Sequence, residues 1–398
     1  MSCVPPLADM HRIYLDYNST TPCAEEVVEA MIPFFGVQCG NPASPHVAGR
    51  EALAAITSAR EDTAAVIGGD PAYLFFTSGA TEANNLALMG MSDHCKTRNR
   101  IVVSAIEHKS VLGPASILAD KGFSVSYIPV DRQGCVDADA ARTLVNDETL
   151  IVSVQGANNE TGVIQPVAEL AAIAHLHGAV FHCDMAQMLG KERIDVNALG
   201  ADILSLSAHK AYGPKGVGAL YIANRTLLSR IKPILSGGGQ ERGLRAGTHN
   251  VPGIVGLGCA CRLVIRNRVG DASRICSLRE RIEQQFRLRL PGASINGLGT
   301  ARLPGTTSLT IPGIQADMLI ANLPNVCIGD GAACSSGAPD PSHVLLAMGL
   351  SRDAAECTVR LSLGRYTALQ DVDVAVDEIV STAMSLYERL AICPRKEF

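Results

Sequence analysis

Short apolar runs recur through the first half of the chain, and segments with helical periodicity separate most of them. Runs of this length between turn residues predict buried strands. Their alternation with helices predicts an α/β fold, in which helices cover both faces of a mainly parallel central sheet and functional sites lie at the strand ends. The predicted strands are residues 73–76, 101–104, 124–129, 150–154, 179–183, 202–206 and 218–222.

The segment 166–177 illustrates the helical pattern between two of these strands. Pro166 is typical of a first helical turn, and Gly178 is typical of a helix end. Apolar residues recur between them and predict one buried face. These residues are Val167, Leu170, Ile173 and Leu176.

The pattern changes at about residue 258, where longer helical segments begin. Residues 273–289 and 371–390 are predicted as helices, with short strand-like pieces between them. We therefore expect two domains. Residues 14–257 would form a large domain, and residues 1–13 together with 258–398 would form a smaller α+β domain.

Chemically distinctive residues follow the strand predicted at 202–206. The sequence SLSAHK at 205–210 places two hydroxyls, a histidine and a lysine at its end. A lysine at the end of a buried strand is poorly solvated and loses part of its preference for the charged form, as an amine must before it attacks an aldehyde. Lys210 is therefore a candidate for Schiff-base formation. The alternative is a surface lysine that opens a loop.

The strand predicted at 179–183 ends in an acid, Asp184, and Gln187 follows three residues later. A carboxylate at this position can pair with a protonated pyridine nitrogen, as an aspartate does for pyridoxal phosphate (PLP). Gln187 could then reach the phenolic oxygen of the same ring. The alternative is that Asp184 caps a helix.

A third segment has the features of a phosphate site. The apolar strand at 73–76 runs into TSGATEAN at 77–84, in which Gly79 allows a tight turn and Ala80 begins a predicted helix. Free N–H groups at a helix start suit a phosphate. Helix capping by Thr77, Ser78 and Glu82 would explain the segment without a ligand, although the two roles are compatible.

Longer motifs follow one another over nearly the whole chain: IYLDYNSTTP (13–22), GNPAS (40–44), TSGATEANNLA (77–87), EHKS (107–110), ANNETGVIQP (157–166), HCDMAQ (182–187), SAHKAYGPKG (207–216), GGGQERGLRAGT (237–248), GAACSS (331–336) and RLSLGRYT (360–367). In content and order this series resembles the NifS/IscS-type cysteine desulfurases. The resemblance implies the PLP-dependent aspartate aminotransferase fold (fold type I), usually assembled as a homodimer.

The resemblance also implies roles for individual residues. Lys210 would hold PLP as a Schiff base, Asp184 would contact its ring nitrogen and Gln187 its phenolic oxygen. Thr248 would reach the phosphate bound by the other subunit, so that each site needs the dimer. The phosphate in the same subunit would be held by Ala80, Thr81, Ser207 and His209.

Three further residues are expected around the substrate by the same resemblance. His108 would stack on the cofactor ring and carry protons, although the sequence alone favours a core histidine at a strand end. Asn159 and Arg360 would take the substrate carboxylate, Arg360 through a bidentate fork. A structural ion pair is the alternative for Arg360.

The reaction implied by the resemblance converts L-cysteine to L-alanine and transfers sulfur to an enzyme cysteine, which passes the persulfide to an acceptor protein. Cys334, in GAACSS, matches the family's cysteine loop and has small neighbours that let a loop move. Cys327 lies in an apolar stretch and is expected to be a buried strand residue. Asp330 departs from the family's usual Ser-Ser-Gly and would disfavour a nearby thiolate. Cys327 therefore remains a possible primary or relay thiol.

Composition and charge limit the other possibilities. A net charge of −5 without a basic tract argues against direct nucleic-acid binding, and no apolar run or leader indicates a membrane segment or a secretion signal. Thirteen cysteines without regular spacing favour a reducing compartment over disulfides or a metal site. We therefore expect a soluble, cytoplasmic protein without metal, in which Cys259 and Cys261 are ordinary buried thiols.

Two other functions remain open at this stage. A selenocysteine lyase or an aminotransferase could share the fold, and a non-catalytic scaffold in a sulfur-transfer complex could share the ancestry. Intact Lys210, Asp184, His108 and loop cysteines argue against the scaffold. The destination of the sulfur is also open, since iron–sulfur cluster assembly, tRNA thiolation and DNA phosphorothioation would all fit these motifs.

Overall fold

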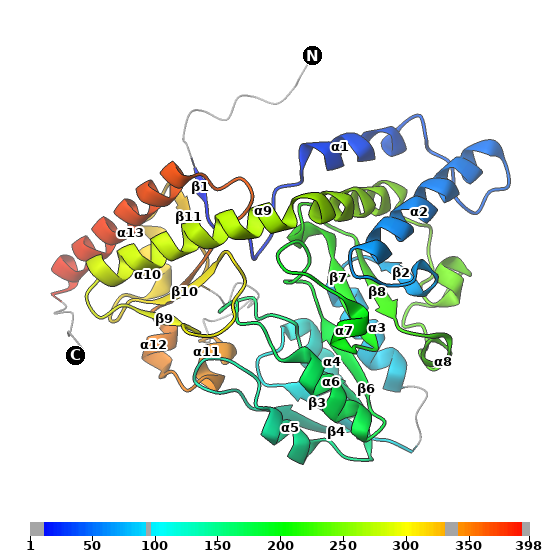
Figure 1. The fold of residues 1–398 in the computed structure, drawn as a ribbon, viewed down its shortest axis with the longest axis horizontal. Coiled ribbons are helices and arrows are strands. Elements are labelled where there is room, and N and C mark those ends of the chain that lie inside the picture. The colour runs from blue at the N-terminus through cyan, green and yellow to red at the C-terminus, as the bar shows by residue number, and fades with distance from the viewer. Residues whose placement is uncertain (1–11, 93–96, 331–340, 392–398) are drawn as a thin grey trace.

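A seven-stranded sheet forms the centre of the larger part of the molecule in a computed structural model that describes residues 12–92, 97–330 and 341–391 (Figure 1). In spatial order the strands are β2 (Leu74–Thr77), β8 (Gly218–Ile222), β7 (Ile203–Ser207), β6 (Val180–Asp184), β5 (Thr149–Ser153), β3 (Arg100–Ser104) and β4 (Ser124–Ile128). The five strands from β7 to β4 in this order are parallel to their neighbours, whereas β8 is antiparallel to both β7 and β2. The predicted mainly parallel sheet is confirmed.

Helices cover both faces of this sheet because successive strand residues point to opposite sides. The helices of this part are α1 (Glu25–Met31), α2 (Val47–Ala65), α3 (Ala80–Ser92), α4 (Lys109–Asp120), α5 (Ala138–Leu144), α6 (Val167–Leu176), α7 (Val196–Leu199) and α8 (Arg225–Leu228), with 3₁₀ turns η1 (Ile32–Phe35), η2 (Pro71–Tyr73), η3 (Ala208–Lys210) and η4 (Gln240–Gly243). Phe75, for example, belongs to one buried cluster with α3 and α4, whereas Phe76 belongs to a second cluster with α2, α5 and α6.

Helix α6 confirms the helix predicted at 166–177 but corrects its apolar face. Val167, Leu170 and Ile173 are buried, whereas Leu176 is 82% exposed. Steps of three residues fall about 60° short of a full helical turn each time, so that the fourth residue of the series has rotated away from the sheet. The positive φ of Gly178 (64°) ends the helix as predicted.

The largest departure from the sequence prediction is α9 (Val251–Arg289), a single helix of 39 residues that begins well before the predicted start at 273. The first turns of this helix contain Pro252 and three glycines, residues of low helix propensity. In the structure Pro252 occupies the first turn, where it is tolerated, and the glycines allow close packing. A Cβ on Gly258 would lie 2.6 Å from Cα of Ala59 in α2.

The smaller part of the molecule is built on an antiparallel sheet, at the left of Figure 1. Its strands are β12 (Thr358–Ser362), β10 (Thr306–Thr310) and β9 (Ser294–Asn296), in that order, and β1 (Ile13–Tyr14) pairs in parallel with β11 (Val326–Cys327) nearby. Its helices are α10 (Ala316–Ala321), α11 (His343–Ala347), α12 (Arg352–Glu356) and α13 (Leu369–Leu390), the last close to the predicted 371–390.

Helix α9 takes part in the cores of both parts. Its residues up to Val264 pack into the core beside the large sheet, and those from Ile275 onward pack with Ile13 and Leu15 in the core of the smaller part. The change between cores therefore falls inside the helix. The domain boundary at 257/258 stays a prediction. Within the described residues, no helix is both long enough and apolar enough to cross a membrane.

The close approach of α9 to α2 predicts opposite effects for two glycine substitutions on one helix. Gly258→Ala should destabilise the protein by about 1–3 kcal/mol, because the added Cβ forces α2 away. Gly270→Ala should stabilise it by up to about 1 kcal/mol, because nothing lies within 4 Å of the added atom. Thermal unfolding midpoints measure both, and shifts of the same sign would contradict the packing argument.

Candidate active site

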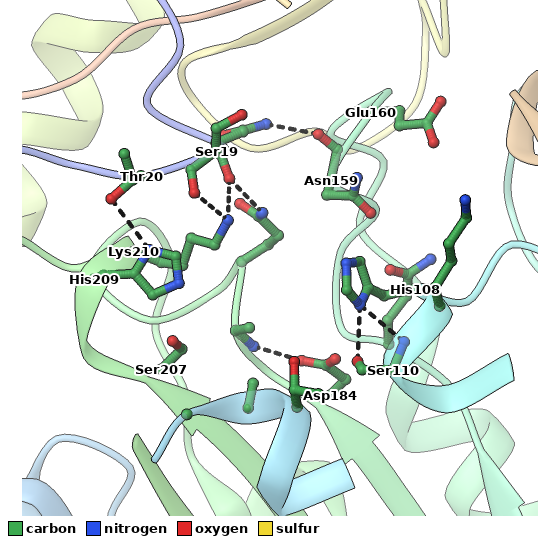
Figure 2. Close-up of a pocket in the computed structure, with 18 of the residues that line it drawn as sticks. Ser19, Thr20, His108, Ser110, Asn159, Glu160, Asp184, Ser207, His209 and Lys210 are labelled. Carbon is green, nitrogen blue, oxygen red and sulfur yellow. Dashed lines mark hydrogen bonds between the residues drawn. The ribbon is translucent and has the colours of Figure 1, made fainter. Parts of the chain in front are cut away.

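A cavity of about 930 Å³ lies where the carboxyl ends of β6 and β7 meet segments from both parts of the molecule (Figure 2). Parallel strands bring their ends to one edge of a sheet, which explains why residues far apart in sequence meet here. The residues predicted from the sequence that line this cavity are Ala80, Thr81, His108, Asn159, Asp184, Gln187, Ser207, His209, Lys210 and Arg360.

Lys210 reaches the cavity from η3, the 3₁₀ turn that follows β7. Its Nζ donates hydrogen bonds to the main-chain oxygens of Asn18 and Ser19, the latter at 2.7 Å. The amine is therefore held by carbonyl oxygens at the wall of the cavity rather than extended into solvent. The surface-lysine alternative is wrong.

Asp184 ends β6 with its side chain at the floor of the cavity in the view of Figure 2. One carboxylate oxygen accepts from the N–H of Ala186 at 2.9 Å and the other from Nδ2 of Asn84 at 2.7 Å. No helix follows directly, so the capping alternative is wrong. Asn84 lies on the buried face of α3 and also donates to Ser110 Oγ. Asn84 was not predicted, because the TEANN segment does not show from the sequence which of its amides is buried.

The turn between β2 and α3 supplies another part of the cavity wall. Gly79 has φ 154°, and nothing lies within 4 Å of the position where a Cβ would stand, so the space above it is open. The N–H of Ser78 donates to Glu82 Oε2 at 2.8 Å, and Glu82 Oε1 pairs with Arg245 at 2.9 Å. Burial opposes the charge on Glu82, but the hydrogen bonds from Arg245 and Ser78 outweigh it and lower its pKa. Of the three residues predicted to cap α3, Glu82 accepts from the Ser78 N–H and Thr77 Oγ1 accepts from the Gly79 N–H at 3.4 Å.

Two histidines face the cavity in neutral form. Burial lowers the pKa of His209 to about 4, with Lys210 acting in the same direction, and its Nδ1 lies 3.2 Å from Thr20 Oγ1. Burial also lowers the pKa of His108, whereas Asp184 opposes the shift. The main-chain N–H of Ser110 donates to His108 Nδ1 at 3.1 Å, so that His108 caps α4 while its ring lines the cavity.

Arg360, in β12, has partners on three sides. Its Nη2 donates to Asp16 Oδ1 and to Ser19 Oγ, each at 2.7 Å, and its Nη1 donates to the main-chain oxygen of Asn159 at 3.1 Å. Its Nε is buried without a hydrogen-bond partner. The structural ion pair named as the alternative is therefore present, although Arg360 also lines the cavity. Asp16 belongs to IYLDYNSTTP, but its role was not predicted.

Two buried acids belong to the surroundings of the cavity, Glu160 in its lining and Glu107 outside that lining. Burial raises the pKa of Glu107 to about 8 and that of Glu160 to about 7. Glu160 accepts a hydrogen bond from Ser342, and Asp330 raises the pKa of Glu160 further. Glu107 is therefore largely protonated at neutral pH. Both acids lie within quoted motifs, but the sequence alone did not show that they are buried.

Two predicted site residues, Thr248 and Cys327, do not line the cavity, and a third is not among the described residues. Thr248 is exposed and does not line the cavity of its own chain. Cys327 is in β11, as predicted, but it is half-buried rather than buried and also does not line the cavity. Cys334 lies outside the described residues. Cys259 and Cys261 are buried thiols, as expected.

The segment that carries Thr248 is anchored through Glu241. This carboxylate accepts from both terminal nitrogens of Arg60, from the N–H of Phe76 and from His249 Nε2, at 2.7–2.9 Å. Burial opposes its charge, but these donors lower its pKa to about 2. Glu241 thereby fixes the segment 237–248 against β2 and α2.

Comparison with known proteins agrees with this arrangement. The family model of the class-V aminotransferases matches residues 13–374. The cysteine desulfurase IscS of Anaeromyxobacter dehalogenans (strain 2CP-C) is 41% identical over 366 residues, which are 92% of this chain and 90% of that protein.

Two solved structures show the same fold. A NifS-like protein superposes with a TM-score of 0.88 at 37% identity, covering 94% of this chain and all (100%) of that one. DndA from Streptomyces lividans superposes with a TM-score of 0.75 at 35% identity, covering 87% and 98%. The chain therefore belongs to the class-V aminotransferase family, and within it to the group of the IscS and NifS-like cysteine desulfurases.

Proposed function

We propose that this PLP-dependent cysteine desulfurase takes sulfur from L-cysteine, releases L-alanine and carries the sulfur as a persulfide on one of its own cysteines. The observation that carries the proposal is the placement of Lys210 and Asp184 on one cavity, at the ends of neighbouring parallel strands. An amine for the aldehyde and a carboxylate for the ring nitrogen are the two groups that PLP chemistry requires from the protein.

The side chains around the cavity fit this cofactor. The open space above Gly79 and the first turn of α3 suit a phosphate, and Asp184 suits a protonated pyridine nitrogen. When bound, PLP supplies an electron sink that stabilises negative charge at the substrate Cα. Ala80, Thr81, Ser207 and His209 would hold its phosphate, and Gln187 its phenolic oxygen.

The remaining residues bind the substrate and move protons. His108 is neutral near pH 7, so it can accept a proton at one step and return it at another. Asn159 and Arg360 would bind the substrate carboxylate. The hydrogen bonds from Arg360 to Asp16 and Ser19 would then loosen as the substrate carboxylate enters, because that carboxylate would compete with the Asp16 carboxylate for the same guanidinium.

The overall reaction is balanced without an external oxidant. L-Cysteine loses its Cβ–S bond and becomes L-alanine, while the enzyme thiol gains that sulfur and becomes a persulfide. Cys334 is the proposed nucleophile because of its motif and its small neighbours. Cys327 is less suited because it is a strand residue that does not line the cavity.

We further propose that the working unit is a homodimer. Apolar side chains gather in and beside α1 and η1 with large exposed fractions, including Ile32 (60%), Phe35 (70%) and Val37 (92%). Exposed clusters of this kind are typical of interaction surfaces. Thr248 would then complete the phosphate site of the partner subunit.

The sulfur acceptor is proposed to be another protein. Its pathway stays open among iron–sulfur cluster assembly, tRNA thiolation and DNA phosphorothioation, which all fit the motifs. All nine cysteines in the described residues are free thiols, which supports a reducing compartment such as the cytoplasm.

The central test measures sulfide and alanine released from L-cysteine with a thiol reductant present. The wild-type protein should release both in equal amounts, and Lys210→Ala should lose at least about 10³-fold in rate, because no amine remains to bind the aldehyde or move the proton. Lys121→Ala, at an exposed lysine that ends α4, is the control. Formation of a keto acid instead of alanine would show an aminotransferase and overturn the proposal.

Substitution of single thiols should identify the nucleophile. Cys334→Ser should retain the cofactor's visible absorption but lose sulfide release, because a hydroxyl cannot form a persulfide. Cys327→Ser should keep most of the activity, as should Cys39→Ser at an exposed position. Loss of release in Cys327→Ser, with Cys334→Ser still active, would reverse the assignment.

A mixed dimer tests whether each site is shared between subunits. When a Lys210→Ala chain pairs with a Thr248→Ala chain, a shared site predicts one intact site, formed by Lys210 of the second chain and Thr248 of the first. The mixed dimer should then be more active than either parent dimer. If both residues served the same subunit, every site would carry a defect, and mixing would restore nothing.

A further inference from the structure

A second lysine, Lys191, contacts the cofactor-facing residues from behind without lining the cavity itself. Its Nζ donates to Oε1 of Gln187 at 2.7 Å and to Oδ1 of Asn18 at 2.6 Å. The charged groups that act on it, Lys210 and Arg360, are both cations, and no carboxylate in the described part of the chain forms an ion pair with it. Burial, together with Lys210 and Arg360, lowers the pKa of Lys191 well below the usual range of a lysine, so the two oxygens that accept its hydrogen bonds are what hold this amine in place.

The direction of these hydrogen bonds fixes the orientation of the Gln187 amide. Lys191 Nζ donates to the Gln187 oxygen, whereas the main-chain oxygen of Asn18 can only accept, so the Gln187 oxygen faces Lys191 and its nitrogen faces Asn18. The amide nitrogen donates to the main-chain oxygen of Asn18 at 2.9 Å and keeps a second N–H. If the amide were reversed, its NH₂ group would stand against the N–H donors of Lys191 and its oxygen against the Asn18 carbonyl, and both hydrogen bonds would be lost.

The same contacts reach Lys210. The main-chain oxygen of Asn18 accepts both Gln187 Nε2 and Lys210 Nζ. The side-chain oxygen of Asn18 accepts from Lys191. Asn18 therefore joins Lys191, Gln187 and Lys210, so a change at Lys191 can reach Lys210 through Gln187 or through Asn18.

We propose that Lys191 is a positioning residue that locks Gln187 as a hydrogen-bond donor toward the bound cofactor. This inference rests on the proposed function, since it takes PLP to be joined to Lys210 with its phenolic oxygen near Gln187. A donor at that oxygen stabilises the oxygen's negative charge and weakens its attraction for the proton on the Lys210 nitrogen.

The test is the pH midpoint of the visible absorption band of the cofactor-loaded enzyme. Lys191→Met should raise the midpoint by about one pH unit, because the phenolic oxygen loses an oriented donor and holds the neighbouring proton more tightly. Lys191→Arg keeps a charged donor and should restore most of the wild-type value. Lys121→Met removes the same charge at the surface and should leave the midpoint unchanged.

A double-mutant cycle separates positioning from a direct effect of charge. If Lys191 acts through Gln187, the shift caused by Lys191→Met should fall below half in a Gln187→Ala background. A full shift in that background would mean that charge alone acts, and it would overturn the proposal. So would a midpoint that does not move in Lys191→Met.

Two further measurements keep the result decisive. If Lys191→Met does not fold, Lys191→Gln serves instead, because its amide can accept as well as donate and no longer dictates the orientation of Gln187; it should shift the midpoint in the same direction. A wild-type protein with neither absorption band nor sulfide release would refute the proposed function. A normal wild-type band that Lys191 variants leave unmoved refutes the role of Lys191 alone.

Discussion

The hydrogen bonds of one buried residue, Asn18, hold the site together. Its main-chain oxygen accepts from Lys210 and Gln187, and its main-chain N–H donates to Ser362 Oγ at 2.8 Å. Its side-chain nitrogen donates to the main-chain oxygen of Asn159 and to Thr306 Oγ1. A buried polar group left without partners costs about 1–3 kcal/mol, so the elements that supply these partners are held in fixed positions.

The location of Asn18 explains why the site lies at the junction of the two sheets. Thr306 and Ser362 belong to the antiparallel sheet, whereas Gln187 and Lys210 follow strands of the seven-stranded sheet. The N-terminal segment that begins with β1 passes between them and satisfies both. The orientation of Lys210 thus depends on residues from three regions that are far apart in sequence.

Local pattern sufficed to predict most of the large sheet and two residues at its carboxyl edge, Lys210 and Asp184, because each comes at the end of an apolar run that predicts a buried strand. Most of the other residues predicted to line the cavity came from the resemblance. Asn18, Asn84 and Lys191 were not found, because an isolated amide or lysine has the same sequence signature whether it faces solvent or closes a network. Asn84 binds Asp184, 100 residues away, and Lys191 binds Asn18, 173 residues away, and one sequence does not reveal such partners.

The errors have a related physical origin. The start of α9 was placed too late, because its first turns contain Pro252 and three glycines, whose low helix propensity is opposed here by close packing such as that of Gly258 on Ala59. The role of Thr248 and the choice between Cys327 and Cys334 stay predictions, because they concern a proposed second subunit and a segment beyond the described residues. No local pattern could decide them.

Helix α9 has a mechanical consequence. At about 1.5 Å per residue it is a rod of roughly 58 Å that belongs to both cores. The two parts of the molecule cannot rotate about a flexible joint at this point, because any such rotation would have to bend a continuous helix. The helix therefore resists any change in the relative position of the two sides of the cavity.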